Sequence, residues 1–259
     1  MKTNELLSNV GKSRGHFASK SNRIAKLIDM WPELESKFVA MIKRGRGSSE
    51  QARMAYATLL MMETGIRTGN ESSAEGFICD NRKIAQKDNP EKGYKKGDVI
   101  WQHPSHGKLV KTYGLTTLLH NHVTRNGKKL EISFVGKKIV EQNLIVRHPI
   151  LLRYCPKGDK NDLFLGIRYY ELKKFVKRYV GRGFTPKDIR MTKVNLIFVN
   201  KFGRKPHDRN FDVETTKAGK KKILSLAIEE TANMIGHTKG VCRSSYLSPS
   251  LLQFILGEI

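Results

Sequence analysis

Apolar residues recur every three or four positions through the first part of the chain, over residues 22–43. This spacing places them on one face, so it predicts an amphipathic helix. The glycines and serines of residues 45–49 interrupt the pattern, and Ser48 or Ser49 can cap the next helix. Residues 51–63 then predict a buried helix, which ends at residues 64–65 because glycine permits a positive φ there.

Strand-like patterns follow in the middle of the chain. Three short runs of apolar and β-branched residues predict strands: residues 118–123, 129–135 and 139–146. A hairpin signal over residues 125–127 and a tight turn over residues 136–138 join them into a small antiparallel sheet. Before them, residues 79–112 are turn-rich and charged, which predicts a long surface loop with one strand near residues 99–101.

The last third of the chain is predicted to be mainly helical. Helical patterns return in four segments: residues 169–180, 185–202, 220–234 and 248–256. Pro186 suits the first turn of the second helix, because an N–H there has no intrahelical partner to lose. The predicted fold class is therefore α+β, mainly α-helical, with a small antiparallel sheet whose hairpin presents Lys137.

Charge points to a class of partner. Lysine and arginine number 48 against 24 acidic residues, which gives a formal net charge of +24. Because 39% of the residues are hydrophobic, the chain has enough apolar content for a packed core and is not a disordered polycation. A basic folded domain usually binds nucleic acid, since its cations release counterions from the phosphate backbone. Charge alone leaves open a ribosome-associated or merely basic surface protein.

The cysteines and the apolar runs argue against a disulfide-bonded, zinc-binding, membrane-spanning or secreted protein. The three cysteines lack CxxC spacing, which disfavours a disulfide framework or a zinc site and fits a reducing, intracellular compartment where DNA resides. We interpret Cys242 as a small packed side chain and not as a catalyst. No apolar run approaches the ~20 residues of a membrane span, and the N-terminus lacks the apolar stretch of a signal peptide.

The candidate chemistry centres on Tyr246, which follows His237 by nine residues. In a strongly basic protein this pair predicts a nucleophile for DNA phosphodiesters. The phenol supplies the attacking oxygen, and the imidazole donates a hydrogen bond to a phosphoryl oxygen. The transition state also needs positive charge, and the leaving 5′ oxygen needs a proton. With no metal-binding carboxylate cluster evident in the sequence, side chains must supply both.

Three basic residues fit those two tasks. Arg67 lies between glycines just after a predicted helix end, where a phosphate can approach the backbone closely. Lys137 lies at the tip of a predicted hairpin. Arg190 lies at the start of a predicted helix, whose N-terminal dipole favours anions. Arginine grips two phosphate oxygens, and lysine or arginine can protonate the leaving oxygen.

Each basic residue has a structural alternative. Arg67 could pair with a carboxylate at the helix end, and Lys137 could be a solvated turn residue. Arg190 could form a salt bridge with Asp188 or Glu171. Five candidate residues in the order Arg, Lys, Arg, His and Tyr are nevertheless hard to reach by chance.

These residues lie in motifs that resemble those of type IB DNA topoisomerases of the compact poxvirus and bacterial kind. The matching stretches, spread over about residues 50–250, are Thr64–Asn70, Gly114–Leu118, Phe134–Lys137, Lys187–Arg190 with Val194–Asn195, and Gly236–Tyr246. The resemblance implies a DNA breaking-rejoining catalytic domain that acts on double-stranded DNA as a monomer. It also implies a reaction that needs neither ATP nor a metal, so no cofactor is expected.

The same resemblance assigns roles to the five residues. Tyr246 would attack the scissile phosphate to form a 3′-phosphotyrosyl link, and His237 would hydrogen-bond a nonbridging oxygen. Arg67 and Arg190 would hold the phosphate. Lys137, relayed with Arg67, would protonate the leaving oxygen. Further DNA contacts are expected from Lys187, Thr68, Asn70, Lys138 and Arg243.

Two departures from the family concern domain organisation. The family usually carries a β-rich N-terminal clamp domain, whereas residues 1–46 here predict a basic segment and a helix, followed by a catalytic domain over residues 47–259. We therefore expect the clamp to be absent or supplied by a separate partner. The insert 79–112 is longer than expected, and its eight lysines and arginines make it a candidate partial replacement for the clamp.

Two other functions share most of these residues. A tyrosine recombinase uses the same chemistry, but recombinases generally carry a histidine three residues before the second arginine, where this chain has Lys187. Only thirteen residues follow Tyr246, which leaves little tail to exchange between recombinase subunits. A catalytically silent DNA-binding relative is the other alternative.

Overall fold

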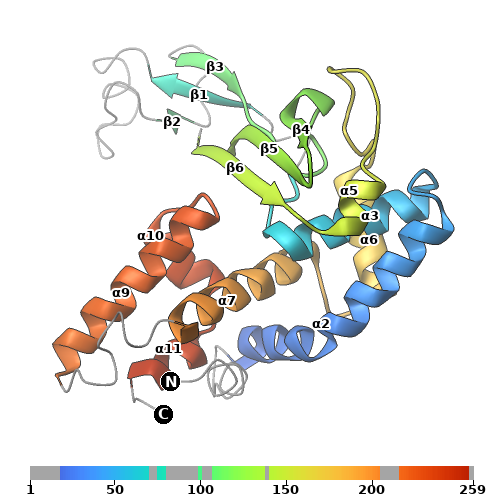
Figure 1. The fold of residues 1–259 in the computed structure, drawn as a ribbon. Coiled ribbons are helices and arrows are strands. Elements are labelled where there is room, and N and C mark those ends of the chain that lie inside the picture. Colours follow the sequence, from blue (N-terminus) through green and yellow to red (C-terminus); the bar gives the residue numbers. More distant parts are fainter. Residues whose placement is uncertain are drawn as a thin grey trace. The chain divides into compact units, whose positions relative to one another are not determined.

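The computed structural model describes residues 18–69, 75–79, 99–100, 107–137, 140–204 and 216–256. The chain divides into two compact units (Figure 1). The helical unit comprises Met1–Arg67 and Tyr170–Ile259, and the sheet unit comprises Thr68–Tyr169.

The described part of the helical unit consists of helices and the turns that join them. In chain order these are α2 (Ala18–Arg44), α3 (Glu50–Thr64), α6 (Tyr169–Tyr179, which starts at the unit boundary), α7 (Pro186–Arg204), α9 (Lys217–Met234), α10 (Lys239–Val241), a single π-helical turn (Cys242–Tyr246) and α11 (Pro249–Leu256). The predicted helices of this unit are confirmed to within a few residues at each end. α10 and the π-helical turn were not predicted.

The first two helices form where the apolar spacing predicts them. The spaced residues Ile24, Leu27 and Phe38 of α2 are buried. Ser49 caps α3 by accepting a hydrogen bond from the backbone N–H of Ala52 at 3.2 Å, as the sequence predicts. α3 ends at Gly65, whose φ of 68° lies in the left-handed region that glycine tolerates best.

Helix α7 packs against α2, α3, α9 and the π-helical turn, so it lies at the centre of the helical unit. Its buried Val194 and Phe198 share one apolar cluster with residues of α9 and α11, such as Ile228 and Leu251. α2 also packs on α3 and α7 within the same unit. The predicted domain boundary at residue 46 stays a prediction.

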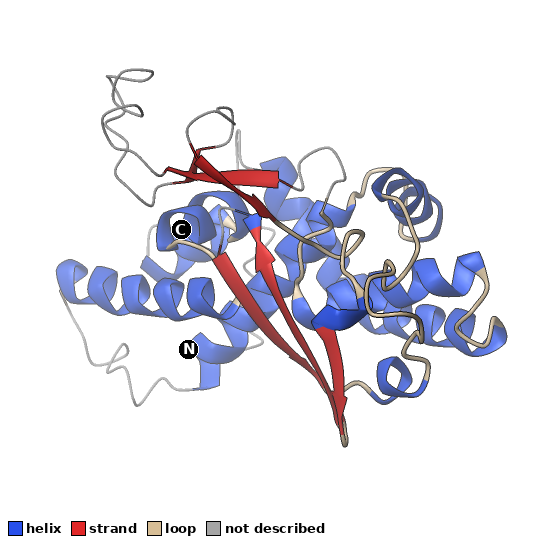
Figure 2. Cartoon of the chain, turned by 90° about the horizontal axis from the view of Figure 1, so that it is seen from above, coloured by secondary structure: helices blue, strands red, loops and turns tan. Residues whose placement is uncertain are grey.

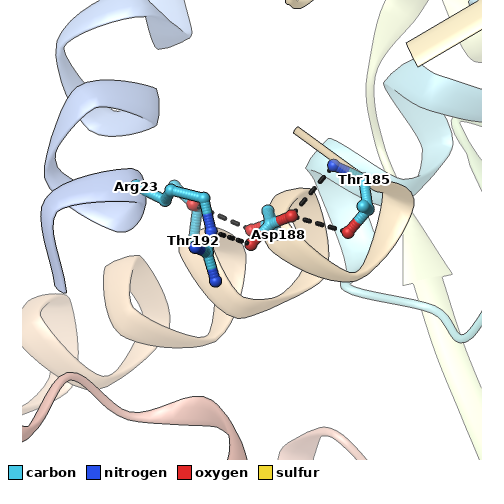
Figure 3. A network of polar contacts seen from close by, with 4 residues as sticks. All are labelled: Arg23, Thr185, Asp188 and Thr192. Atoms are coloured by element: carbon cyan, nitrogen blue, oxygen red, sulfur yellow. Dashed lines mark hydrogen bonds and ion pairs between the residues drawn. The ribbon is translucent and has the colours of Figure 1, made fainter. Parts of the chain in front are cut away.

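A polar network fixes where α7 begins (Figure 3). The backbone N–H and the hydroxyl of Thr185 donate to Asp188 Oδ2 at 2.9 and 2.6 Å. Arg23 of α2 donates to Asp188 Oδ1 at 3.0 Å, which ties the helix start to α2. Thr192 donates to the backbone carbonyl of Asp188 one turn later. This start sets the rotation of α7 and therefore the direction of Arg190.

The strands of the described residues all belong to the sheet unit, where Figure 2 draws them in red. One antiparallel sheet has the order β4-β5-β6, with bounds Val123–Asn126, Lys129–Gly136 and Val140–Val146. Alternate residues Leu130, Ile132 and Phe134 of β5 are buried, as expected for a strand with one covered face. A short helix, α5 (Pro149–Arg153), follows this sheet and was not predicted.

A second antiparallel sheet takes two of its strands from residues 79–112, which were predicted as a surface loop, and its third strand from just before them. Its order is β2-β1-β3, with bounds Val99–Ile100, Glu75–Cys79 and Gly107–Lys111. β1 pairs with β3 in full register, from Glu75 opposite Lys111 to Cys79 opposite Gly107. The strand near residues 99–101 is confirmed, whereas β1 and β3 were missed. Their pairing joins residues about thirty positions apart, which local patterns do not encode.

The predicted strand over residues 118–123 is wrong for most of its length. Leu119 forms an isolated bridge with Leu163, and His120–His122 form a 3₁₀ turn (η4) before β4 begins. The backbone N–H of Leu119 donates to His122 Nδ1 at 3.1 Å, which favours the turn over extended pairing. With these exceptions the predicted class, a mainly helical α+β fold with a small antiparallel sheet, is confirmed. No helix in the described ranges is both long and apolar enough to span a membrane.

Candidate active site

Four of the five predicted catalytic residues meet within the helical unit. Arg67 follows α3, Arg190 lies in α7, His237 follows α9 and Tyr246 ends the π-helical turn. Arg67 Nε donates to His237 Nε2 at 3.1 Å, and Arg190 Nη2 lies 2.7 Å from the same nitrogen. The ring centroids of His237 and Tyr246 are 5.0 Å apart, and the Arg190 guanidinium carbon lies 5.0 Å from the Tyr246 centroid.

The chain turns sharply before both Arg67 and His237. Thr64 donates to the Leu60 carbonyl and accepts from the backbone N–H of Ile66, which together with the left-handed Gly65 ends α3. α9 ends in a similar way at Gly236, whose φ is 61°. The N–H of His237 then donates to a carbonyl of the last turn of α9, that of Ala232, at 2.9 Å. The ends of α3 and α9 therefore fix the backbone positions from which the side chains of Arg67 and His237 extend.

Arg190 is a buried cation, with only 4% of its surface exposed. Burial, together with the nearby Arg67, lowers the pKa of its guanidinium to about 10, and Tyr246 opposes this change. The group still carries its charge at neutral pH. Its Nη2 donates to the Ile235 carbonyl at 3.3 Å, whereas its buried Nε has no hydrogen-bond partner among the described residues. A buried donor of this kind is costly unless another acceptor serves it.

Both arginines point donors at the His237 ring. A guanidinium can only donate hydrogen bonds, so Nε2 of His237 is the acceptor for Arg67 Nε and Arg190 Nη2. Arg67 Nη2 also lies 3.5 Å from Nδ1 of the same ring. Two positive groups converge on one imidazole nitrogen, which is an arrangement suited to an anion that accepts from all three side chains.

Tyr246 is held mainly through its backbone. Its side chain is 5% exposed, and the π-helical turn closes with a hydrogen bond from the Leu247 N–H to the Cys242 carbonyl at 3.1 Å. Asn195 of α7 donates to the Tyr246 carbonyl at 2.9 Å and accepts from the Ser248 N–H at 2.8 Å. Single π turns are rare in helices overall. Those that occur often lie at functional sites.

Cys242 packs in the same apolar cluster as Tyr246. Burial raises the pKa of its thiol to about 11, although Arg190 and Lys20 oppose this change. The thiol is therefore neutral at physiological pH and a poor nucleophile. This agrees with its interpretation as a packed side chain.

A model of the eukaryotic DNA topoisomerase I catalytic core matches residues 105–253, more than half of the chain. The chain belongs to the DNA topoisomerase I family. The predicted resemblance to the type IB group is confirmed, because the curated relatives include several viral DNA topoisomerases 1B.

Viral topoisomerases I are among the proteins to which the chain is similar. DNA topoisomerase 1 of rabbit fibroma virus is 30% identical over 149 residues, which cover 56% of this chain and 45% of the relative. DNA topoisomerase 1B of vaccinia virus is 25% identical over 154 residues, 57% of this chain and 46% of the relative. DNA topoisomerase 1B of Acanthamoeba polyphaga mimivirus is 26% identical over 155 residues. The chain thus spans less than half the length of the relatives it matches.

The fifth predicted residue of the family site, Lys137, belongs to the sheet unit. It is exposed and directly follows β5, at the turn toward β6. Gly136 pairs with Val140 at this end of the β5–β6 hairpin, so the predicted hairpin position of Lys137 is confirmed. Its part in catalysis stays a prediction.

The predicted DNA contacts are spread over both units. In the helical unit, Lys187 is exposed in the first turn of α7, and Arg243 is exposed in the π-helical turn. In the sheet unit, the Thr68 carbonyl accepts from the N–H and the hydroxyl of Thr116 at 2.7 and 2.9 Å. Asn70, Lys138 and most of the insert 79–112 lie outside the described residues.

The structural alternatives for the two arginines are not adopted in this structure. Asp188 pairs with Arg23, and the contacts of Arg190 are with Ile235, His237 and Tyr246 instead of a carboxylate. Arg67 donates to an imidazole. In the sequence Asn195 is only part of a motif and has no assigned role, whereas in the structure its side chain holds the Tyr246 backbone. Its place in that motif, five residues after Arg190, was the signal available.

Proposed function

We propose that this chain is the catalytic domain of a type IB DNA topoisomerase, which relaxes double-stranded DNA by breaking and rejoining one strand. The observation that supports it most is the convergence of two guanidinium groups on His237 beside the Tyr246 ring. This set joins a nucleophile with groups that bind a phosphate anion. Family membership supports the same reaction.

The proposed cleavage step exchanges one phosphodiester for another. The Tyr246 oxygen attacks the scissile phosphorus and its phenolic proton is lost to solvent. The bond from phosphorus to the 5′ oxygen breaks, and that oxygen takes a proton from Lys137, relayed with Arg67. The products are a 3′-phosphotyrosyl link and a free 5′ hydroxyl.

Phosphate binding requires the arginines to change partners. In this structure both donate to His237 Nε2, whereas a phosphate offers stronger, charged acceptors. Once the arginines donate to the phosphate, His237 Nε2 can carry a proton and donate to a nonbridging oxygen. The buried Nε of Arg190 supports this proposal, because it has no acceptor within the described part of the chain.

Rejoining reverses the step after the free strand has rotated. The 5′ hydroxyl attacks the phosphotyrosine and releases Tyr246. Because the bond energy is kept in the covalent link, the cycle needs no ATP. Positive charge at the phosphate comes from arginine side chains, which is why we expect activity without a metal.

Relaxation of supercoiled plasmid tests this proposal. We expect the wild-type chain to relax plasmid in EDTA without ATP, and Tyr246→Phe to leave the plasmid supercoiled. Tyr169→Phe, which changes a partly exposed tyrosine at the start of α6, is the matched control and should relax plasmid normally. A wild-type chain that binds DNA but never relaxes or cleaves it would instead be a silent relative. Cleavage confined to one specific sequence would favour a recombinase.

A further inference from the structure

Lys20, near the start of α2, reaches the segment that carries Tyr246. Its ammonium donates to the Leu247 carbonyl at 2.9 Å and to the Ser244 carbonyl at 3.1 Å. These two carbonyls lie on either side of Tyr246 in the sequence. The contact joins residues more than 220 positions apart.

The neighbouring contacts extend this attachment. Ser21 and Ser248 share a hydrogen bond between their buried hydroxyls at 3.0 Å. Asn195 of α7 donates a hydrogen bond to the Tyr246 carbonyl. The backbone of the tyrosine segment is therefore fixed from two helices, by α7 at the tyrosine itself and by α2 on both sides of it.

We propose that Lys20 is a positioning residue for the nucleophile: its charged ammonium holds the backbone on both sides of Tyr246 so that the phenol keeps its direction of attack. This inference rests on the proposed function. Lysine suits the task because its ammonium has three donors and can serve two carbonyls at once. This role of Lys20 would make α2 part of the catalytic apparatus, although none of the five proposed catalytic residues lies in that helix.

The charge on Lys20 is sensitive to pH. Burial and the nearby Lys187 of α7 lower the pKa of the ammonium to about 8, and Cys242 of the π-helical turn opposes this change. Arg23 of α2, which lines the same surface groove as Lys20 and Lys187, is neutralised by its ion pair with Asp188. The ammonium is therefore present at neutral pH and is lost as the pH rises through about 8. A neutral amine donates weaker hydrogen bonds.

Three variants test the proposal on a suicide substrate, with the rate of covalent adduct formation measured at saturating DNA. We expect Lys20→Met to slow this rate about tenfold to a hundredfold, because small misplacement of a reacting group has effects of this size. Lys20→Arg should recover most of the rate, since it keeps the charge and the donors. Lys26→Met, at an exposed lysine of the same helix, should react like wild type. DNA affinity should be unchanged in all three.

A pH profile separates positioning from simple folding support. The ratio of the wild-type rate to the Lys20→Arg rate should be constant below about pH 7 and fall by about pH 9, because arginine keeps its charge there. A constant ratio across this range, or a Lys20→Met rate equal to wild type, would overturn the proposal. If Lys20→Met does not fold, as judged by circular dichroism, the pH ratio decides alone. A wild-type chain that forms no adduct at all would refute the proposed function, and the Lys20 proposal with it.

Discussion

The two units present their proposed catalytic groups in opposite ways. In the helical unit, Arg190 and Tyr246 are buried, and both contact His237 within a connected set of hydrogen bonds and ring contacts. In the sheet unit, Lys137 is exposed and directly follows β5. The groups that would bind the phosphate thus lie together around His237, and they need only exchange this partner for the phosphate. The proposed acid is carried on a separate unit and acts on the leaving oxygen instead of the phosphate, so its loss should leave a different signature on the same cleavage step.

The largest effect is expected from the buried arginine of the helical unit. Arg190→Ala removes a charge aimed at the phosphate, so the rate of covalent adduct formation should fall about a thousandfold. Replacing the leaving 5′ oxygen by sulfur should not restore the rate, because the lost charge acts on the phosphate and not on the leaving group. Arg182→Ala, at an exposed arginine just before α7, is the matched control and should cleave normally. A near-normal rate for Arg190→Ala would contradict its proposed role.

A smaller effect with a different signature is expected from the sheet unit. Lys137→Ala should slow cleavage about a hundredfold, which is typical for the loss of a general acid. Here a 5′-sulfur leaving group should restore most of the rate, since a thiolate leaves without a proton. Lys128→Ala, at an exposed turn lysine at the other end of β5, should show neither change. If sulfur rescued Arg190→Ala and not Lys137→Ala, the proposed division of roles between the units would be reversed.

The smallest catalytic effect is expected from the side chain that fixes the tyrosine backbone. Asn195→Ala leaves the Tyr246 carbonyl and the Ser248 N–H without their buried partner. The free energy of unfolding should therefore fall by about 2–4 kcal/mol, and cleavage should slow about tenfold. Urea denaturation and adduct kinetics measure the two changes. Asn233→Ala, on the exposed surface of α9, should alter neither.

The sequence predicted most of the helical unit because its signals are local. The apolar spacing of α2, the cap at Ser49 and the glycine at the end of α3 each act within a few residues. The five proposed catalytic residues were found for another reason: each lies in a short motif that resembles a family motif. Their grouping around His237 could not be read from spacing alone, since Arg67 and His237 are 170 positions apart.

What the sequence missed depends on partners far along the chain. β1 and β3 have no strong strand pattern, and their register comes from pairing with strands far along the chain. In the sequence Lys20 is one of many basic residues near the N-terminus. Only the structure shows that its ammonium donates hydrogen bonds to the carbonyls of Ser244 and Leu247. The strand predicted at residues 118–123 failed because the ring nitrogen of His122 competes for a backbone N–H.

The decisive measurement is to locate the covalent link between protein and DNA. A nicked suicide duplex, labelled in the scissile strand on the 5′ side of the break, is incubated with the chain in EDTA and then denatured and digested with trypsin. We predict that the label stays on the peptide that contains Tyr246, joined through a 3′ phosphate. A label on another residue, attachment through a 5′ phosphate, or an undiminished adduct in Tyr246→Phe would contradict the proposed chemistry.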